Sequence, residues 1–258
     1  MHPYIDLTLA RHGLTLKSYN LFMLAAAVTV IVIGYRVAAH RGLPAKRTLA
    51  WLAVTALAML PGARVMYLVT HSTVWMEHPE LLWKLQMVYF SIYGGLILTV
   101  AVGGLACLLF RLPLRRLADS VVIGLALGIA VMRVGCYLNG CCFGKVTDLP
   151  WGVSFPTGSF AHNYQLAFGQ KVPLFLGLPL AGSSAVHPTQ LYELAAALLG
   201  TILAVYIMKR QERDGIAFLA FVIWFTGFRF LNHYLRAPSL YFTSPGLFYP
   251  LLYSFIIL

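Results

Sequence analysis

Long uninterrupted apolar runs constrain this chain more than any other feature of its sequence. Several of them reach the roughly 20 residues that an α-helix needs to cross about 30 Å of hydrocarbon. Helices of water-soluble proteins rarely stay apolar on all faces over that length. Of the 258 residues, 60% are hydrophobic and only 10% are charged, so one soluble core cannot bury all the apolar side chains and lipid must cover the remainder. The sequence therefore predicts an all-α, polytopic membrane protein.

The apolar runs predict about seven transmembrane helices. They lie at residues 18–35, 49–70, 88–110, 117–135, 188–208, 215–232 and 243–258. Since no repeat, linker or low-complexity tract divides the chain, residues 1–258 are predicted to form a single membrane-embedded domain. The charged residues before the first run, and the length of that run, do not fit a cleavable signal peptide, so we expect the first helix to remain in the mature protein.

The distribution of charge predicts the orientation in the membrane. The net charge is +11, and the basic residues lie beside the apolar runs, which indicates a membrane surface and no nucleic acid as partner. Three connections are net positive and a fourth is net negative, namely 36–47, 111–119 and 209–214 against 71–87. The positive-inside rule then places the N-terminus outside and the C-terminus in the cytoplasm. The connection at about 136–187 is predicted to be a small irregular extracytoplasmic head.

Four arginines fall near the predicted outer ends of helices, where the positive-inside bias predicts few. They are Arg64, Arg133, Arg229 and Arg236. Any one of them is explained equally well by a long side chain that carries its charge to the headgroups. A cluster of them indicates an anionic ligand. A phospholipid phosphate is the natural anion at that depth, and a guanidinium holds it through two parallel hydrogen bonds.

Residues 133–145, at the end of the fourth predicted helix, combine an arginine with three glycines. Glycines let the backbone approach a headgroup closely, and Asn139 offers both a hydrogen-bond donor and an acceptor. A second polar stretch, His-Pro-Thr-Gln-Leu-Tyr-Glu at residues 187–193, enters the outer end of a predicted helix. Capping by Thr189 and the helix dipole explain part of it, but they do not account for His187 or Gln190.

Small residues inside the apolar runs allow two interpretations. Gly94 and Gly95 follow Tyr93 in an otherwise apolar segment. Such residues most often let helices pack closely, and the alternative is a place in the lipid site. The spacing of Gly124 and Gly128 indicates packing alone.

Three cysteines in the predicted head raise the question of a metal site. Cys136, Cys141 and Cys142 match no paired zinc-binding spacing, and adjacent cysteines are awkward as two ligands of one ion. These three cysteines are therefore not predicted to bind a metal. In an oxidising compartment, a disulfide from Cys136 to Cys141 or Cys142 is the favoured structural use. Cys107 is expected to be an ordinary buried hydrophobe.

In three blocks, residues 133–144, 187–193 and 229–238, the sequence resembles the bacterial prolipoprotein diacylglyceryl transferase family. The family pattern in the first block is Gly-Arg-x-Gly-Asn-x-x-Asn-Gly-Glu-x-x-Gly, and the second block is kept whole. The chain keeps Arg133, Gly135, Asn139, Gly140 and Gly144 of the first block, while Cys136 replaces the first Asn and Cys141 the Glu. Tyr93 stands where the family has an essential His, and His233 stands where it has a Glu. Tyr19 resembles the family's membrane-facing Tyr.

The resemblance implies transfer of the diacylglyceryl group of phosphatidylglycerol to the lipobox cysteine of a preprolipoprotein in the bacterial inner membrane, with release of glycerol phosphate. The resemblance implies no metal and no cofactor. A thiolate attacks the glycerol carbon, and two arginines stabilise the leaving phosphate. The residues expected to carry catalysis are Arg133, Arg229, Tyr93, His187 and His233, the last three as candidate bases. Those expected to bind lipid are Tyr19, Arg64, Gly94, Gly95, Asn139, Gly140, Gly144, Gln190, Tyr192, Glu193 and Arg236.

Other functions remain alternatives at this point. A paralogue could keep the lipid site and use a different acceptor, or bind or translocate phospholipid without catalysis. A solute channel or transporter is disfavoured, because the sequence has no paired inverted repeat and no broken midplane helices.

Overall fold

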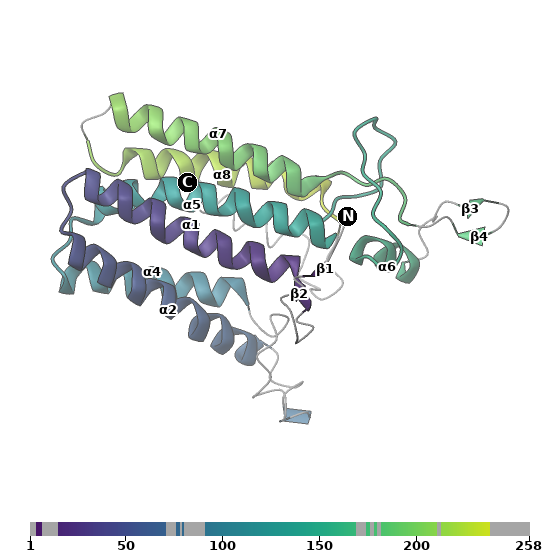
Figure 1. Cartoon of the computed structure of the whole chain (residues 1–258), viewed down its shortest axis with the longest axis horizontal. Coiled ribbons are helices and arrows are strands. Elements are labelled where there is room, and N and C mark those ends of the chain that lie inside the picture. The colour runs from purple at the N-terminus through teal and green to yellow at the C-terminus, as the bar shows by residue number, and fades with distance from the viewer. Residues whose placement is uncertain are drawn as a thin grey trace. The chain divides into compact units, whose positions relative to one another are not determined.

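Among the residues that the structure describes, five helices are long and apolar enough to cross a membrane. The structure is a computed structural model and describes residues 4–6, 15–70, 76–77, 79, 91–168, 174–175, 178–179, 182–210 and 213–237. The five helices in Figure 1 are α1 (Ser18–His40), α2 (Ala45–Thr70), α5 (Leu114–Asn139), α7 (Thr189–Arg210) and α8 (Ile216–Leu235). The helices predicted at 18–35, 49–70, 117–135, 188–208 and 215–232 are confirmed.

The remaining two predicted spans have different outcomes. The run at 88–110 forms α4 (Ile92–Leu109), an apolar helix of 18 residues, whose length at 1.5 Å per residue is about 27 Å. The run at 243–258 lies outside the described residues. The structure thus confirms a helical membrane fold, and the total of seven spans stays a prediction.

The helices place large apolar side chains outward and small or polar side chains inward. Leu57, Leu108 and Ile202 are 69%, 77% and 65% exposed, as expected for side chains that meet lipid. The buried positions are rich in alanine and include polar residues such as Gln190 and Glu193. Lipid tails are as apolar as leucine, so close packing of small residues and hydrogen bonds between helices must hold the bundle together.

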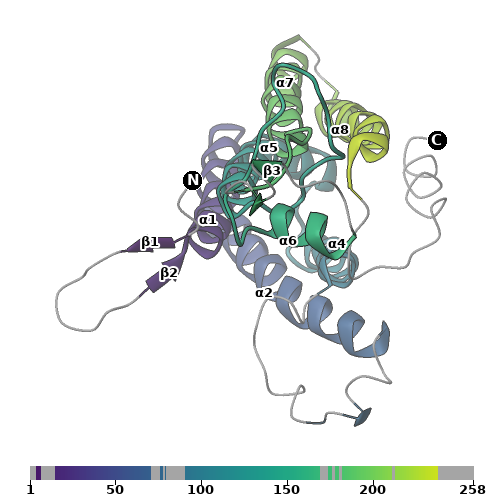
Figure 2. The ribbon, with the colours of Figure 1, turned by 90° about the vertical axis from the view of Figure 1, so that its right-hand side faces the viewer.

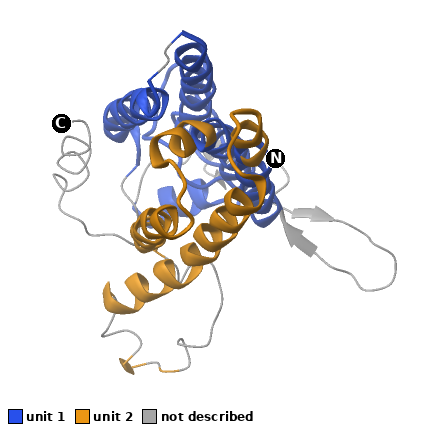
Figure 3. Ribbon diagram, turned by 90° about the vertical axis from the view of Figure 1, so that its left-hand side faces the viewer, with its two compact units in different colours: residues 1–34, 121–258 blue, residues 35–120 orange. Residues whose placement is uncertain are grey.

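The chain forms two compact units, shown in Figure 3. Unit 1 comprises residues 1–34 and 121–258, and unit 2 comprises residues 35–120. In unit 2, α2 and α4 pack at two glycines, since a Cβ on Gly94 would lie 2.3 Å from the carbonyl oxygen of Gly62. Arg41 and Asp119 form an ion pair of 3.5 Å in the same unit. The expectation of a single domain stays a prediction.

In unit 1, glycines bring α1 and α5 into close contact, and a shared apolar core joins α5, α7 and α8. A Cβ on Gly124 would lie 2.7 Å from the carbonyl oxygen of Val30, and one on Gly128 would lie 2.6 Å from Val30 Cγ2. The predicted packing role of these glycines is confirmed. The core contains Val122, Ala126, Ala204, Ala217 and Phe221. This packing fixes the ends of the three helices, where the site lies.

The segment between α5 and α7, called the head below, packs around a small core of its own, and its position outside the membrane stays a prediction. Its described residues include a short helix, α6 (Phe160–Ala167), and a hairpin of β3 (Leu174–Phe175) and β4 (Leu178–Pro179), which lie beyond the ends of α5 and α7 in Figure 1. Figure 2 shows α6 and β3 in front of the helices, seen from this end. Phe143, Phe155, Ala161, Tyr164 and Val186 form its core. A second hairpin, of β1 (Tyr4–Asp6) and β2 (Thr15–Lys17), precedes α1.

Candidate active site

Glu193 is the centre of the site, because three arginines surround its carboxylate. It lies near the start of α7 and is only 2% exposed. Arg133 of α5 forms an ion pair with its Oε2, and Arg229 Nη1 of α8 lies 3.6 Å from the same oxygen. Arg236 Nη1 lies 3.6 Å from Oε1, and Asn232 Nδ2 donates a hydrogen bond to Oε1 at 3.0 Å. Side chains from the ends of three helices thus converge on one carboxylate.

This cluster carries more positive than negative charge. Three guanidiniums against one carboxylate leave a surplus of two positive charges. Uncompensated charge is costly to bury, so the site favours an additional anion. The side chain of Arg133 is 6% exposed, whereas those of Arg229 and Arg236 are each 27% exposed. The last two therefore connect the buried carboxylate to the surface, where an anion such as a phosphate has access.

Several buried polar atoms around Glu193 are available for a ligand. Within the described part of the chain, Arg133 Nε, Gln190 Oε1 and Asn232 Oδ1 are buried and make no hydrogen bond. Buried polar groups are normally paired, and these three comprise one donor and two acceptors. A ligand that carries both anionic oxygens and hydroxyl groups would satisfy them.

The end of α5 has the geometry of a Schellman motif. Gly140 adopts a φ of +68°, in the left-handed region. Its amide donates to Tyr137 O at 3.1 Å, and the amide of Cys141 donates to Cys136 O at 3.2 Å. Glycine suits this position because it has no Cβ to clash in the left-handed conformation. The motif reverses the direction of the chain directly after the last turn of α5, the helix that carries Arg133.

The loop after this turn is tied to both α7 and α8. The amide of Gly144 donates to His187 O at 2.9 Å, and the amide of Lys145 donates to Leu235 O at 2.8 Å. A Cβ on Gly144 would lie 2.5 Å from His187 Cβ and 2.7 Å from Leu235 O, so no larger residue fits. From the side of α7, Thr189 Oγ1 donates to Cys142 O and Gln190 Nε2 donates to Cys141 O, both at 2.7 Å.

His187 belongs to a hydrogen-bonded chain with Tyr192 and Trp151. Trp151 Nε1 donates to Tyr192 Oη at 2.8 Å, and Tyr192 Oη lies 3.3 Å from His187 Nδ1. The Tyr192 hydroxyl can accept from the indole N–H and also donate to Nδ1 or accept from a protonated Nδ1, depending on the tautomer of His187.

The sulfur atoms of Cys136, Cys141 and Cys142 all lie within 4.8 Å of one another. The argument that the adjacent Cys141 and Cys142 are awkward as two ligands of one ion is therefore wrong. Cys142 adopts a φ of +60°, which changes the direction of the chain between the two residues. All four cysteines of the chain are free thiols, so the favoured disulfide is not formed in this structure. Cys107 is buried, as expected.

Hydrogen bonds from the thiols of Cys136 and Cys141 lower the pKa of the Cys142 thiol well below its ordinary value. The positive charges of Arg236 and Arg133 add to this effect, which outweighs the opposing effect of burial. The pKa of Cys141 is raised instead, chiefly by its hydrogen bond with Cys136. The cluster therefore favours one thiolate, at Cys142, next to the arginines.

The structure brings most of the predicted site residues of unit 1 together. Arg133, Arg229, Arg236, Glu193 and Gln190 form or border the charged cluster, and Asn139, Gly140 and Gly144 lie in the adjoining turn and loop. Tyr19, near the start of α1, is within electrostatic range of Arg133 and the three cysteines. His233 is half-buried, and its ring lies 5.8 Å from that of Tyr234.

Four other predicted residues, Arg64, Tyr93, Gly94 and Gly95, belong to unit 2. Both glycines pack α4 against α2, since a Cβ on Gly95 would lie 2.9 Å from Met59 O and Gly94 approaches Gly62. Helix packing is one of the two roles predicted for these glycines. The part of these four residues in the site stays a prediction.

Sequence reasoning missed two residues of the site, Asn232 and Trp151. Asn232 is 2% exposed and contacts Glu193 directly. It follows Arg229 by three residues, so it lies on the same helix face, and a polar residue in an apolar helix was a signal that could have found it. Trp151 is 55% exposed and acts through Tyr192, and no local pattern predicts that contact.

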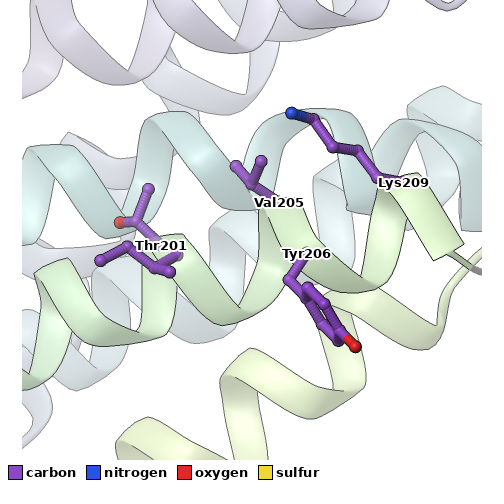
Figure 4. A pocket seen from close by; sticks show the side chains of 5 residues that line it. Thr201, Val205, Tyr206 and Lys209 are labelled. Carbon is purple, nitrogen blue, oxygen red and sulfur yellow. The ribbon is translucent and has the colours of Figure 1, made fainter.

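A hollow on the surface of α7 lies away from this site. Thr201, Val205, Tyr206 and Lys209 line it, together with Ile202, as Figure 4 shows for the labelled side chains. Thr201 follows Glu193 by eight residues, which corresponds to about 12 Å along the helix. The hollow therefore takes no part in the arginine cluster.

Comparison with known proteins identifies the family of this chain. The family model for prolipoprotein diacylglyceryl transferase matches residues 7–257. The phosphatidylglycerol–prolipoprotein diacylglyceryl transferase of Geobacter sulfurreducens is 28% identical over 244 residues, which are 92% of this chain and 84% of that protein. The enzyme of the same name from Proteus mirabilis is 30% identical over 69% of this chain and 61% of its own length. A third relative, phosphatidylglycerol–prolipoprotein diacylglyceryl transferase 2 of Clostridium perfringens, is 27% identical over 87% of this chain and 80% of its own length. The chain belongs to the prolipoprotein diacylglyceryl transferase family.

Proposed function

We propose that this protein transfers the diacylglyceryl group of phosphatidylglycerol to the thiol of the lipobox cysteine of preprolipoproteins, and releases glycerol phosphate. The buried Glu193 with its three arginines carries this proposal, because it creates a surplus of positive charge at one end of apolar helices. A membrane phospholipid supplies a phosphate at that depth. The family match over nearly the whole chain supports the same reaction.

In the proposed reaction, the thiolate sulfur of the acceptor attacks the glycerol carbon that carries the phosphate ester. The S–C bond forms, the C–O bond breaks, and the electron pair of the C–O bond leaves with the phosphate. Charge grows on the phosphate oxygens in the transition state, so fixed guanidiniums stabilise that state more than the substrate. Glu193 positions Arg133 and Arg229 for this task, since both contact its Oε2.

The thiol must lose its proton before it attacks, because the thiolate is the nucleophile. Tyr93, His187 and His233 remain the candidate bases. One ring nitrogen of His187, Nδ1, lies 3.3 Å from the Tyr192 hydroxyl, and its other ring nitrogen, Nε2, is the second candidate proton acceptor. Tyr93 needs a lowered pKa, because an unperturbed phenol titrates near 10.

A direct assay tests the proposal. Purified protein in detergent is mixed with labelled phosphatidylglycerol and a lipobox peptide, and a thioether-linked diacylglyceryl peptide and free glycerol phosphate are measured. We expect both products in equal amounts. A protein that holds phosphatidylglycerol but releases no glycerol phosphate would refute transfer and support a lipid-binding or lipid-translocating paralogue. Release without peptide modification would indicate a different acceptor.

We further propose that the protein crosses the bacterial inner membrane seven times, with the N-terminus and the head outside and the C-terminus in the cytoplasm. The net positive connections support this orientation. The start of α2 is then cytoplasmic, so an Ala45→Cys reporter at this exposed position, in a variant with the four native cysteines replaced by serine, should resist an impermeant thiol reagent added to intact cells. Labelling of this reporter from outside would reverse the orientation.

A further inference from the structure

The three-cysteine cluster has the geometry of a metal site. Cys136 comes from the last turn of α5 and is 3% exposed, and the Schellman turn places Cys141 over it. With Cys142, the three sulfur atoms lie within 4.8 Å of one another. Three thiolates bound to one Zn²⁺ at about 2.3 Å are separated by about 3.8–4.0 Å, so a small contraction would seat the ion.

The backbone behind the sulfurs is held in place before any ion binds. Gln190 Nε2 and Thr189 Oγ1 donate hydrogen bonds of 2.7 Å to the carbonyl oxygens of Cys141 and Cys142. Cys142 keeps a left-handed φ of +60°, which costs about 1–2 kcal/mol for a residue with a side chain. Such a conformation persists only where its surroundings enforce it, and it is typical of functional sites.

The charges around the cluster suit a metal–thiolate complex. Three thiolates and one Zn²⁺ together carry one negative charge, and the surplus of the arginine cluster is positive. Arg133 Nη1 lies 3.9 Å from Cys136 Sγ, close enough to donate a weak hydrogen bond to sulfur. Among the described residues, no further His, Cys, Asp or Glu belongs to the group. Three protein ligands and one open position are the pattern of catalytic zinc.

We propose that Cys136, Cys141 and Cys142 bind one Zn²⁺, and that the acceptor thiol of the substrate takes the open fourth position. This inference rests on the proposed function and names the group that activates its thiol. Coordination releases the thiol proton to solvent, because a metal-bound thiol is deprotonated. The bound thiolate attacks the glycerol carbon, the C–O bond breaks, and glycerol phosphate leaves toward the arginines. The thioether product is a weaker ligand than a thiolate and dissociates.

Metal content provides the first test and does not depend on activity. The purified full-length protein is loaded with Zn²⁺, freed of excess ion and analysed. We expect one zinc per chain, lost in C136S, C141S and C142S and kept in the matched control C107S, since Cys107 lies outside the cluster. Zinc that is absent, or that stays when the three cysteines are replaced, would overturn the inference. Bound copper in place of zinc would overturn it too, because three thiolates alone satisfy Cu(I).

The open position is tested by replacing Zn²⁺ with Co²⁺, because the visible spectrum of bound Co²⁺ reports which ligands coordinate it. A lipobox peptide should change the spectrum, and the same peptide with serine for the acceptor cysteine should not. An unchanged spectrum would mean a closed structural site and would overturn the proposal.

Chelation of the unmodified protein avoids variants that fail to fold. Transfer should fall by on the order of 10²-fold and return when Zn²⁺ is added. Full transfer by the metal-free protein would overturn the inference and leave the proposed function intact. A third outcome separates the two proposals. If the peptide changes the Co²⁺ spectrum but the zinc-loaded protein forms no thioether-linked lipid, the metal site is supported and the proposed function is refuted.

Discussion

The two ends of α7 both carry charged residues, but only one end is a site. At its start, Glu193 is buried and contacts arginines from α5 and α8. At its end, Lys209 and Arg210 are exposed, and Arg210 lies 5.5 Å from the ring of Tyr206 on its own helix. Long basic side chains and the helix dipole explain the second end locally. Charge at a helix end is thus common, and burial with partners from distant segments distinguishes a functional end.

Removal of the Glu193 charge should have the largest effect. Glu193→Gln keeps the shape of the side chain but leaves three guanidiniums without their counter-charge. Breaking a buried ion pair in this way costs about 3–5 kcal/mol, so we expect a clear loss of thermal stability in detergent and of transfer activity. Arg210→Gln, at the other end of α7, should change stability by no more than about 0.5 kcal/mol. Equal behaviour of the two variants would remove the distinction between the ends.

Lysine in place of Arg133 or Arg229 should reduce transfer without loss of the fold. Lysine keeps the charge but cannot form the paired hydrogen bonds of a guanidinium, so the rate should fall on the order of 10²-fold or more. Arg210→Lys is the matched control and should keep full activity. If both Lys variants transfer at the parental rate and express equally, the arginines only anchor the protein in lipid.

Tyr192→Phe should have a smaller effect, because it removes one hydroxyl that joins Trp151 to His187. Loss of about 1 kcal/mol of hydrogen bonding corresponds to a roughly fivefold change in rate. Tyr206→Phe, in the hollow at the other end of α7, should leave the rate unchanged. A Tyr192→Phe enzyme that transfers at the parental rate would exclude this hydrogen-bonded chain from catalysis.

Alanine at the left-handed glycines should have the smallest effect. Gly140 and Gly215 have φ values of +68° and +98° and lie at opposite ends of the helices of unit 1. Each Gly→Ala change should cost about 1 kcal/mol of stability. Only Gly140→Ala should also reduce transfer, because its turn positions the three cysteines. Equal transfer in both variants would indicate that the loop tolerates displacement.

Some parts of the site could be predicted because their signals are local. The apolar run of α8 and the arginine near its end are visible in one stretch of sequence, as are the cap and polar residues at the start of α7. The sequence predicted Arg133 and Arg229 as catalytic residues that stabilise one leaving phosphate, and Glu193 as a lipid-binding residue. It could not show that both arginines contact the carboxylate of Glu193, because residues 133 and 193 are separated by the whole head.

The amino-acid sequence alone determined that the chain forms apolar helices of membrane-spanning length, and where most of them begin and end. Hydropathy and helix-ending signals act within a few residues, so they are readable without the fold. Only the tertiary structure decided that Glu193 holds three arginines, that Trp151 reaches His187 through Tyr192, and that adjacent cysteines converge with Cys136. These contacts depend on how α5, α7, α8 and the head pack together, and on one left-handed backbone angle at Cys142. No periodicity in the sequence predicts these contacts or this backbone angle.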